Sequence, residues 1–120
     1  MSGRANAATG DAIKQAIEAS DARMLASYYA EDAMVRIIDR NNPPCRPREI
    51  KGKAAIDMSW DDVCSRTATH HVEDVITEGN RIAFTQACAY PDGTKVFSAS
   101  ILVLNDGRIV GQTVVQAWDE

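Results

Sequence analysis

The sequence of 120 residues lacks several features that mark special classes of protein. No apolar run approaches the roughly 20 residues of a transmembrane helix, and the first residues hold no apolar segment of the signal-peptide type. Acidic residues outnumber basic ones, 17 to 13, which disfavours a nucleic-acid partner. Together these absences predict a cytoplasmic protein that binds neither a membrane nor nucleic acid.

Cysteine and histidine are also scarce. The three cysteines, Cys45, Cys64 and Cys88, are far apart and form no CxxC pair, so we expect reduced thiols. The two histidines, His70 and His71, are adjacent, and adjacent side chains of a strand point to opposite faces. They cannot both bind one ion, and we expect neither a metal nor another cofactor.

Helical periodicity covers the N-terminal part of the chain. From Asp11 to Tyr28 apolar residues recur at spacings of three and four, and Ser20-Asp21 between them is a good N-cap. This pattern predicts two helices, or one helix that bends. A third helix is expected at KAAIDMSWDDVC, after a proline-rich loop.

Strand patterns dominate the remainder. The β-rich segment AMVRIID precedes the proline-rich loop, and four strands separated by turn signals are expected after Arg66: TATHHVEDVI, RIAFTQACAY, KVFSASILVL and RIVGQTVVQAWD. An order in which helices come first and an antiparallel meander comes last is typical of the α+β class. Residues 1–10 are expected to be disordered, which leaves 11–120 as a single domain.

The predicted strands carry almost no charge on either face. Helices can cover only one face of a sheet, so the other should pack on a partner, for which a second copy is the commonest choice. The sequence therefore predicts a homodimer through the outer sheet face. Its expected members are Thr85, Ala87, Ala89, Ala99, Ile101, Val103, Thr113 and Val115.

Three segments resemble a known family. YYAEDAMV at the end of the second helix, GKAAI at the start of the third, and the ending DGRIVGQTVVQAWD resemble the nuclear transport factor 2-like superfamily, in particular its SnoaL-like and ketosteroid-isomerase-like branch. The resemblance covers roughly residues 11–119. It implies a cone-shaped, cystatin-like roll with three N-terminal helices on a strongly curved antiparallel sheet, a pocket inside, and dimerisation through the outer face.

In such a cone one face of the last strand lines the pocket. We expect a small apolar metabolite to bind there, held by apolar walls and a few amides and hydroxyls. An alternative is that the glutamines lie near an exposed sheet end. The predicted substrate-binding residues are Tyr28, Trp60, Phe84, Gln86, Ser100, Gln112, Val114, Gln116 and Trp118, with Ser98 facing the same space.

The isomerases of this family use an aspartate base, a tyrosine and a protonated aspartic acid. The resemblance places Ile37 at the base position and Ile13 at the tyrosine position, while the second acid falls at or beside Ser100. A typical ketosteroid isomerase is therefore not expected.

His70 and Asp39 are the remaining candidate catalytic residues. His70 shares a strand face with Val72 and should point inward, either as a general acid–base or as a core histidine bonded to a serine or glutamine. Asp39 is either a base at the pocket mouth or a solvent-exposed loop aspartate beside Arg40. Cys88 has no evident basic neighbour and is expected to be a small core residue.

Three functions remain open. The first is a cofactor-independent isomerase or cyclase that moves a proton on a largely apolar carbonyl compound. The second is a ligand-binding cone without catalysis, and the third is a dimerisation domain. A pocket that contains an imidazole or carboxylate of perturbed pKa would favour the enzyme. A pocket with amides alone would favour the ligand-binding cone, and a filled interior would favour the dimerisation domain.

Overall fold

The computed structural model describes residues 7–119, and its elements follow the predicted order of helices and strands. Most of the tail predicted to be disordered lies outside this range. Helices α1–α3 span Gly10–Glu18, Ala22–Ser27 and Lys53–Ser65. Strands β1–β6 span Tyr29–Ile38, Arg48–Lys51, Thr69–Glu78, Arg81–Ala89, Lys95–Asn105 and Arg108–Trp118. The predicted α+β fold class is confirmed.

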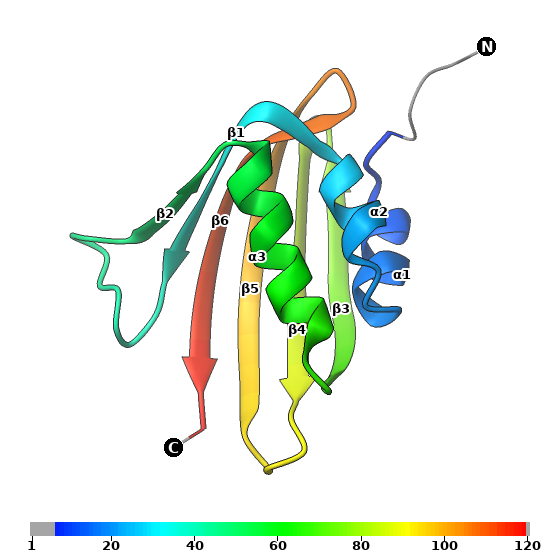
Figure 1. Ribbon diagram of the computed structural model, residues 1–120. Coiled ribbons are helices and arrows are strands. Elements are labelled where there is room, and N and C mark those ends of the chain that lie inside the picture. The colour runs from blue at the N-terminus through cyan, green and yellow to red at the C-terminus, as the bar shows by residue number, and fades with distance from the viewer. Residues whose placement is uncertain (1–6, 120) are drawn as a thin grey trace.

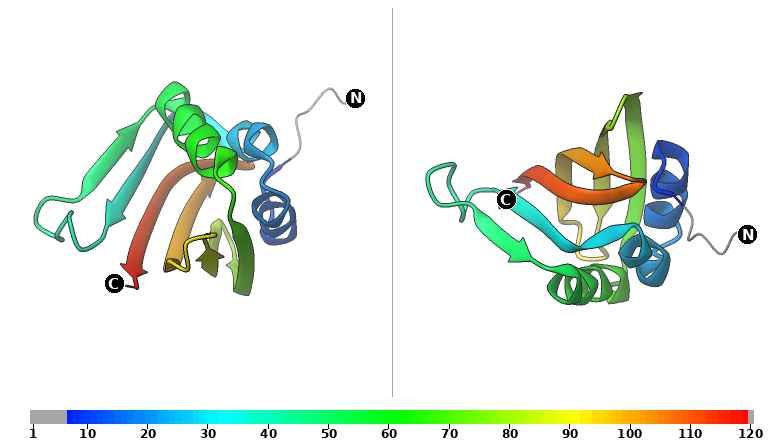
Figure 2. Two further views of the ribbon diagram at one scale, coloured as in Figure 1. Left: turned by 60° about the horizontal axis from the view of Figure 1, so that its bottom comes forward. Right: turned by 90° about the horizontal axis from the view of Figure 1, so that it is seen from above.

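The strands form one sheet of six in the order β2-β1-β6-β5-β4-β3. The sheet curves strongly, and all three helices lie on its concave side (Figures 1 and 2). Strand β1 pairs with β6 in parallel, whereas the other neighbouring strands pair antiparallel. Strand β2 falls in the segment predicted to be a loop. It forms because Arg48–Lys51 follows Pro47, the last proline of that segment, and can pair with the edge of β1.

The predicted break between the first two helices is confirmed. The Asp21 side chain accepts a hydrogen bond from the Met24 amide at 3.1 Å and so caps the start of α2. Helix α2 then ends at Ser27, and the chain enters β1 at Tyr29, earlier than predicted. The amide of Ile109 in β6 donates to the Tyr28 carbonyl at 2.8 Å, so pairing with the sheet replaces a further helical turn.

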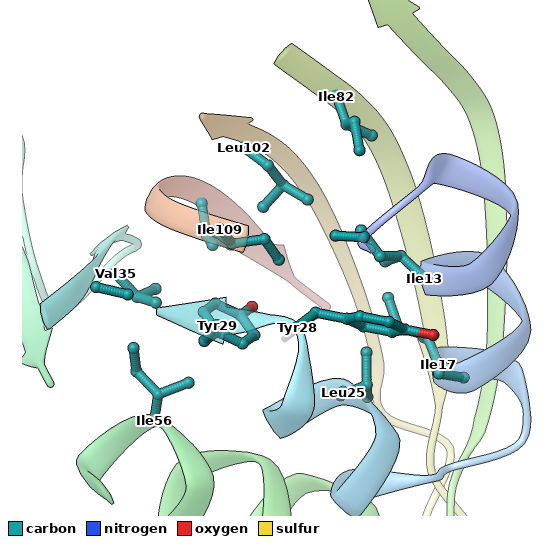
Figure 3. Close-up of a cluster of buried hydrophobic side chains, with 14 of the residues drawn as sticks. Ile13, Ile17, Leu25, Tyr28, Tyr29, Val35, Ile56, Ile82, Leu102 and Ile109 are labelled. Carbon is teal, nitrogen blue, oxygen red and sulfur yellow. The ribbon is translucent and has the colours of Figure 1, made fainter. Parts of the chain in front are cut away.

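Apolar side chains from the helices pack on the concave face of the sheet (Figure 3). Helix α1 lies close to β3: a Cβ at Gly10 would come within 2.5 Å of Val75 Cγ1. Tyr28 and Tyr29 are both buried but diverge, Tyr28 lying beside Ile17 and Tyr29 on the side of Val35 (Figure 3). The adjacent tyrosines thus belong to different parts of the interior.

The convex face of β4, β5 and β6 is covered by none of the helices, as predicted (Figure 2). Phe97, Ile101 and Val115 there are each more than half exposed, at 52%, 51% and 51%. Small residues such as Ala87 and Ala99 lie between them. This convex surface is called the outer face below, and the concave surface the inner face.

Candidate functional site

A cavity of about 130 Å³ lies between helix α3 and the inner face of the sheet. Its apolar wall comes from β1, β2, α3 and β6, including Val35, Ile37, Ile50, Ile56, Trp60, Val63 and Val114. Its polar wall comes mostly from β4, β5 and β6 and comprises Tyr29, Gln86, Ser98, Ser100, Gln112 and Gln116, together with Ser59 of α3. The interior of the cone is therefore not filled, which disfavours dimerisation as the sole function.

The cavity continues into an open groove at the wide end of the cone, the lower end in Figure 1. Ile37, Val63, Tyr90 and Gln116 line both spaces. The rim of this groove is charged, with contributions from Arg48, Glu49, Lys51, Asp62, Arg66, Asp92 and Asp119. A ligand would therefore pass a polar rim before it reaches the apolar interior.

A chain of hydrogen bonds crosses the inner end of the cavity. Trp60 Nε1 donates to Tyr29 Oη at 3.3 Å, and Tyr29 Oη donates to Gln112 Oε1 at 2.5 Å. Gln112 Nε2 in turn donates to Ser100 Oγ at 3.3 Å. Burial raises the pKa of Tyr29, so its phenol stays neutral and keeps its proton to donate.

This network leaves donors that face the cavity. Gln112 uses one of its two amide N–H groups on Ser100, and the hydroxyl protons of Ser98 and Ser100 are available. Gln116 uses its carbonyl oxygen to accept from Trp118 Nε1 at 3.4 Å, which leaves its amide N–H groups. The site therefore offers several hydrogen-bond donors to a ligand.

Six of the predicted substrate-binding residues line the cavity: Trp60, Gln86, Ser100, Gln112, Val114 and Gln116. Tyr28 and Phe84 are buried in the hydrophobic core, away from the cavity wall. Trp118 lies half-buried in the groove, where the Arg40 guanidinium sits 5.8 Å from the centre of its ring.

Tyr29, the second member of the hydrogen-bond chain, was not predicted because its segment was expected to end a helix. Alternation alone could not have found it, because counting back in twos from Val35 and Ala33 reaches the exposed Glu31, and the pairing with β6 is irregular between Tyr29 and Met34. Of the positions aligned with isomerase residues, Ile37 lines the cavity and Ile13 is buried in the core. Neither offers a titratable group.

Asp39 lies at the rim of the groove rather than in the cavity. Its Oδ1 accepts from the amides of Asn41 and Asn42, each at 2.9 Å, and so holds the turn between β1 and β2. Asp39 thus lies in the loop, as the second alternative expected, but it is half-buried and stabilises the turn.

His70 points inward, as its shared face with Val72 predicted, and only 8% of it is exposed. Its Nδ1 lies 3.0 Å from Cys88 Sγ, and Gln86 Nε2 lies 3.3 Å from the same sulfur. The expectation that Cys88 has no basic neighbour is therefore wrong. Burial lowers the pKa of His70 and raises that of Cys88, so both groups are neutral near pH 7.

A β-bulge accounts for this pairing. Near the turn Ile76 pairs with Ala83, whereas beyond Asp74 Glu73 pairs with Thr85, a shift of one residue. Asp74 has a φ of 55°, a conformation that aspartate tolerates better than most residues. Without the bulge His71 would lie opposite Cys88; with it His70 does.

Residues 7–119 contain no group of three or more His, Cys, Asp or Glu side chains placed to hold a metal ion. Over the same residues, no helix has the length and apolar character needed to cross a membrane.

Several solved structures are similar to this one. An NTF2-like protein of unknown function from Mesorhizobium loti has a TM-score of 0.74 at 18% identity, over 88% of this chain and 84% of that one. A candidate ketosteroid isomerase from Kribbella flavida has a TM-score of 0.71 at 17% identity, over 92% and 74%. A computationally designed 17-OHP binder has a TM-score of 0.66 at 17% identity, over 92% and 93%. These likenesses establish the fold.

No curated protein matches the chain significantly. The family model of the SnoaL-like domain, by contrast, matches residues 11–112, which is most of the chain and includes α1 through the start of β6. The protein therefore belongs to the SnoaL-like domain family, with an NTF2-like fold.

Proposed function

We propose that the protein binds a small, largely apolar compound with a hydrogen-bond acceptor, such as a carbonyl oxygen, in the cavity of the cone. The observation that carries this proposal is the polar wall, with its several hydrogen-bond donors, opposite an apolar one. A cavity of about 150 Å³ in another protein holds benzene. The cavity here, about 130 Å³ and partly open, therefore suits a ligand of roughly one six-membered ring, with any extension in the groove.

Binding without catalysis is favoured by the composition of the wall. The described residues that line the cavity include neither a carboxylate nor an imidazole. The position that matches the isomerase base is the apolar Ile37. A designed protein of similar fold is named as a 17-OHP binder, which supports ligand binding as a use of this architecture.

A second candidate is cofactor-independent proton transfer on such a compound, of the isomerase or cyclase type. It is favoured by His70, whose buried imidazole has a lowered pKa and would be an unprotonated base near pH 7. His70 lies behind Cys88 rather than in the wall, so it would act through the sulfur or after a rearrangement. Substrate screening with His70→Asn, and with His71→Asn as control, tests this candidate.

We also propose that two copies associate through their outer faces. Phe97, Ile101 and Val115 project from neighbouring strands, and the small side chains between them allow a second sheet to approach. A two-fold arrangement would place the outer face of one copy against the outer face of the other. Cytoplasmic localisation remains a prediction.

Cyclohexanone is a suitable probe for the binding proposal. Titration calorimetry should detect binding to the wild type. Ser100→Ala and Gln112→Leu should each weaken it by about threefold to tenfold, the effect of one lost hydrogen bond. Thr113→Val, one residue along β6 on the outer face, should bind as the wild type does. Equal weakening by Thr113→Val, or no binding to the wild type, would contradict the proposal.

A further inference from the structure

We propose that Cys88 and His70 form a covalent capture site for α,β-unsaturated carbonyl compounds that enter the cavity. Cys88 Sγ is the nucleophile and His70 Nδ1 the base. This inference rests on the proposed function, because the carbonyl oxygen must be held by the polar wall. It adds a reaction that reversible binding does not require.

The hydrogen-bond geometry accommodates a thiol that donates its proton to the histidine. Gln86 Nε2 lies 3.3 Å from Cys88 Sγ and 3.5 Å from His70 Nδ1. We assign the imidazole proton to Nε2, because the lone pair of Nδ1 then faces the amide N–H of Gln86. The Cys88 thiol then donates to Nδ1 across the 3.0 Å gap, and the imidazole carries its own proton on Nε2.

The second ring nitrogen distinguishes this histidine from a fully hydrogen-bonded core residue. His70 Nε2 is buried and has no hydrogen-bond partner among the described residues. A structural histidine would normally use both nitrogens, because a buried polar atom without a partner is destabilising. The contact with the thiol is therefore the interaction that holds His70 here. An apolar residue at this position would avoid the cost of burying Nε2 without a hydrogen bond.

Cys88 lies where a compound bound in the cavity can reach its sulfur. Its side chain lines the cavity next to Gln86, while Ser98 lies directly across from Gln86 on β5. A ring in the cavity would contact the apolar wall and place its carbonyl oxygen near these donors. The apolar wall selects an uncharged electrophile, and the cavity admits about one ring.

The reaction balances without a further reactant. The sulfur forms a bond to the β-carbon as the C=C π bond breaks and the S–H proton moves to His70 Nδ1. The electron pair of the broken bond moves onto the carbonyl oxygen as an enolate, which N–H and O–H donors of the polar wall stabilise. The imidazolium then returns its proton to the α-carbon, which leaves a neutral histidine and a saturated thioether adduct.

The other two cysteines are internal controls. Cys45 is exposed and lies in the loop between β1 and β2. Burial raises the pKa of the Cys64 thiol, as it does for Cys88, but Cys64 lies on α3 and does not line the cavity. A reaction that depends on the cavity and on His70 should therefore label Cys88 and spare Cys64.

The probe is 2-cyclohexen-1-one, which matches cyclohexanone in size but carries the reactive double bond. Labelling is followed by intact-protein mass spectrometry and peptide mapping on the Cys45→Ser background. We expect one adduct, at Cys88, formed at least tenfold faster than at Cys64. His70→Asn should slow it at least tenfold, within the usual contribution of a general base. Excess cyclohexanone should protect Cys88.

The pH profile separates a base from a structural residue. With His70 as base, the Cys88 rate should be nearly flat from neutral pH upward, because the imidazole is already unprotonated. In His70→Asn it should rise about tenfold per pH unit, as for a free thiolate. If His70→Asn fails to fold, the wild-type profile and the ratio of Cys88 to Cys64 still decide the matter.

Labelling of Cys64 as fast as Cys88, an unchanged rate in His70→Asn, or a wild-type rate that rises tenfold per pH unit would each overturn the capture site. If cyclohexanone binds but 2-cyclohexen-1-one gives no adduct, the capture site fails and the proposed function stands. If neither compound occupies the cavity, both fail.

Discussion

Along part of β5 and β6 the usual distribution of polar and apolar side chains is reversed. On β5 and β6 the inner face buries Ser98, Ser100 and Gln112, whereas the outer face leaves Ile101 and Val115 half exposed. Residues one position apart on the same strand thus have opposite environments. Stability alone would favour the reverse arrangement, because burying an amide is tolerated only when its hydrogen bonds are made.

The comparison indicates that each face is adapted to a partner. The inner face retains polar groups where a ligand can use them, and it holds them in place through the Tyr29–Gln112–Ser100 chain. The outer face retains apolar groups where a second sheet can cover them. Substitutions at neighbouring positions should therefore have different kinds of effect.

The largest effect is expected on association. Ile101→Asp would place a charge at the centre of the outer face and should convert a homodimer into a folded monomer. Light scattering at micromolar concentration measures the mass, and circular dichroism checks the fold. Thr77→Asp, on an exposed part of β3, is the control and should leave the mass unchanged. A monomeric wild type would contradict the homodimer.

Core packing on the inner face should account for the next largest effect. Leu102→Ala removes one of the most buried side chains and should lower the free energy of unfolding by about 2–5 kcal/mol. Ile101→Ala, measured where the chain is monomeric, should cost less than about 1 kcal/mol because its side chain is half exposed. Urea denaturation measures the free energy of unfolding of both variants. Equal losses would contradict the proposed difference between the two faces.

The polar chain should contribute a smaller amount. Gln112→Leu leaves the buried Tyr29 hydroxyl without its acceptor and should destabilise the fold by about 1–3 kcal/mol. Thr113→Val, the adjacent outer-face residue, should change stability by no more than about 0.5 kcal/mol. Gln112→Leu as stable as the wild type would mean that the network is dispensable to the fold.

The smallest effect concerns pH. Burial lowers the pKa of His70 in the folded state below its ordinary value of about 6.5. The unfolded chain therefore takes up a proton more readily, and stability should fall as the pH drops below that value. His70→Asn should lose this part of the pH dependence, whereas His71→Asn should keep it. Urea titrations between neutral and mildly acidic pH provide the measurement.

Local patterns predicted much of this molecule. The Asp21 cap separated α1 from α2, and alternation along β6 placed Gln112, Val114 and Gln116 on one face, which the family resemblance assigned to the pocket. These features depend on neighbours a few positions apart, so they can be read from the sequence. The uncharged outer face was predicted in the same way.

The errors arose where distant segments decide the local structure. Pairing with β6 turned Tyr29 into a strand residue, and pairing with β1 made a strand of Arg48–Lys51. The bulge at Asp74 moved His70 opposite Cys88, and no local pattern fixed the register on its far side. A one-residue shift decided which histidine meets the thiol.

The central claim is that the inner face binds a small acceptor compound while the outer face does not. It is tested most directly by NMR titration of the labelled protein with cyclohexanone. Along β5 and β6 we expect the side-chain signals of Ser98, Ser100 and Gln112 to shift, and those of Ala99 and Thr113 to stay in place. Shifts on the outer-face residues, or none on either set, would contradict the account.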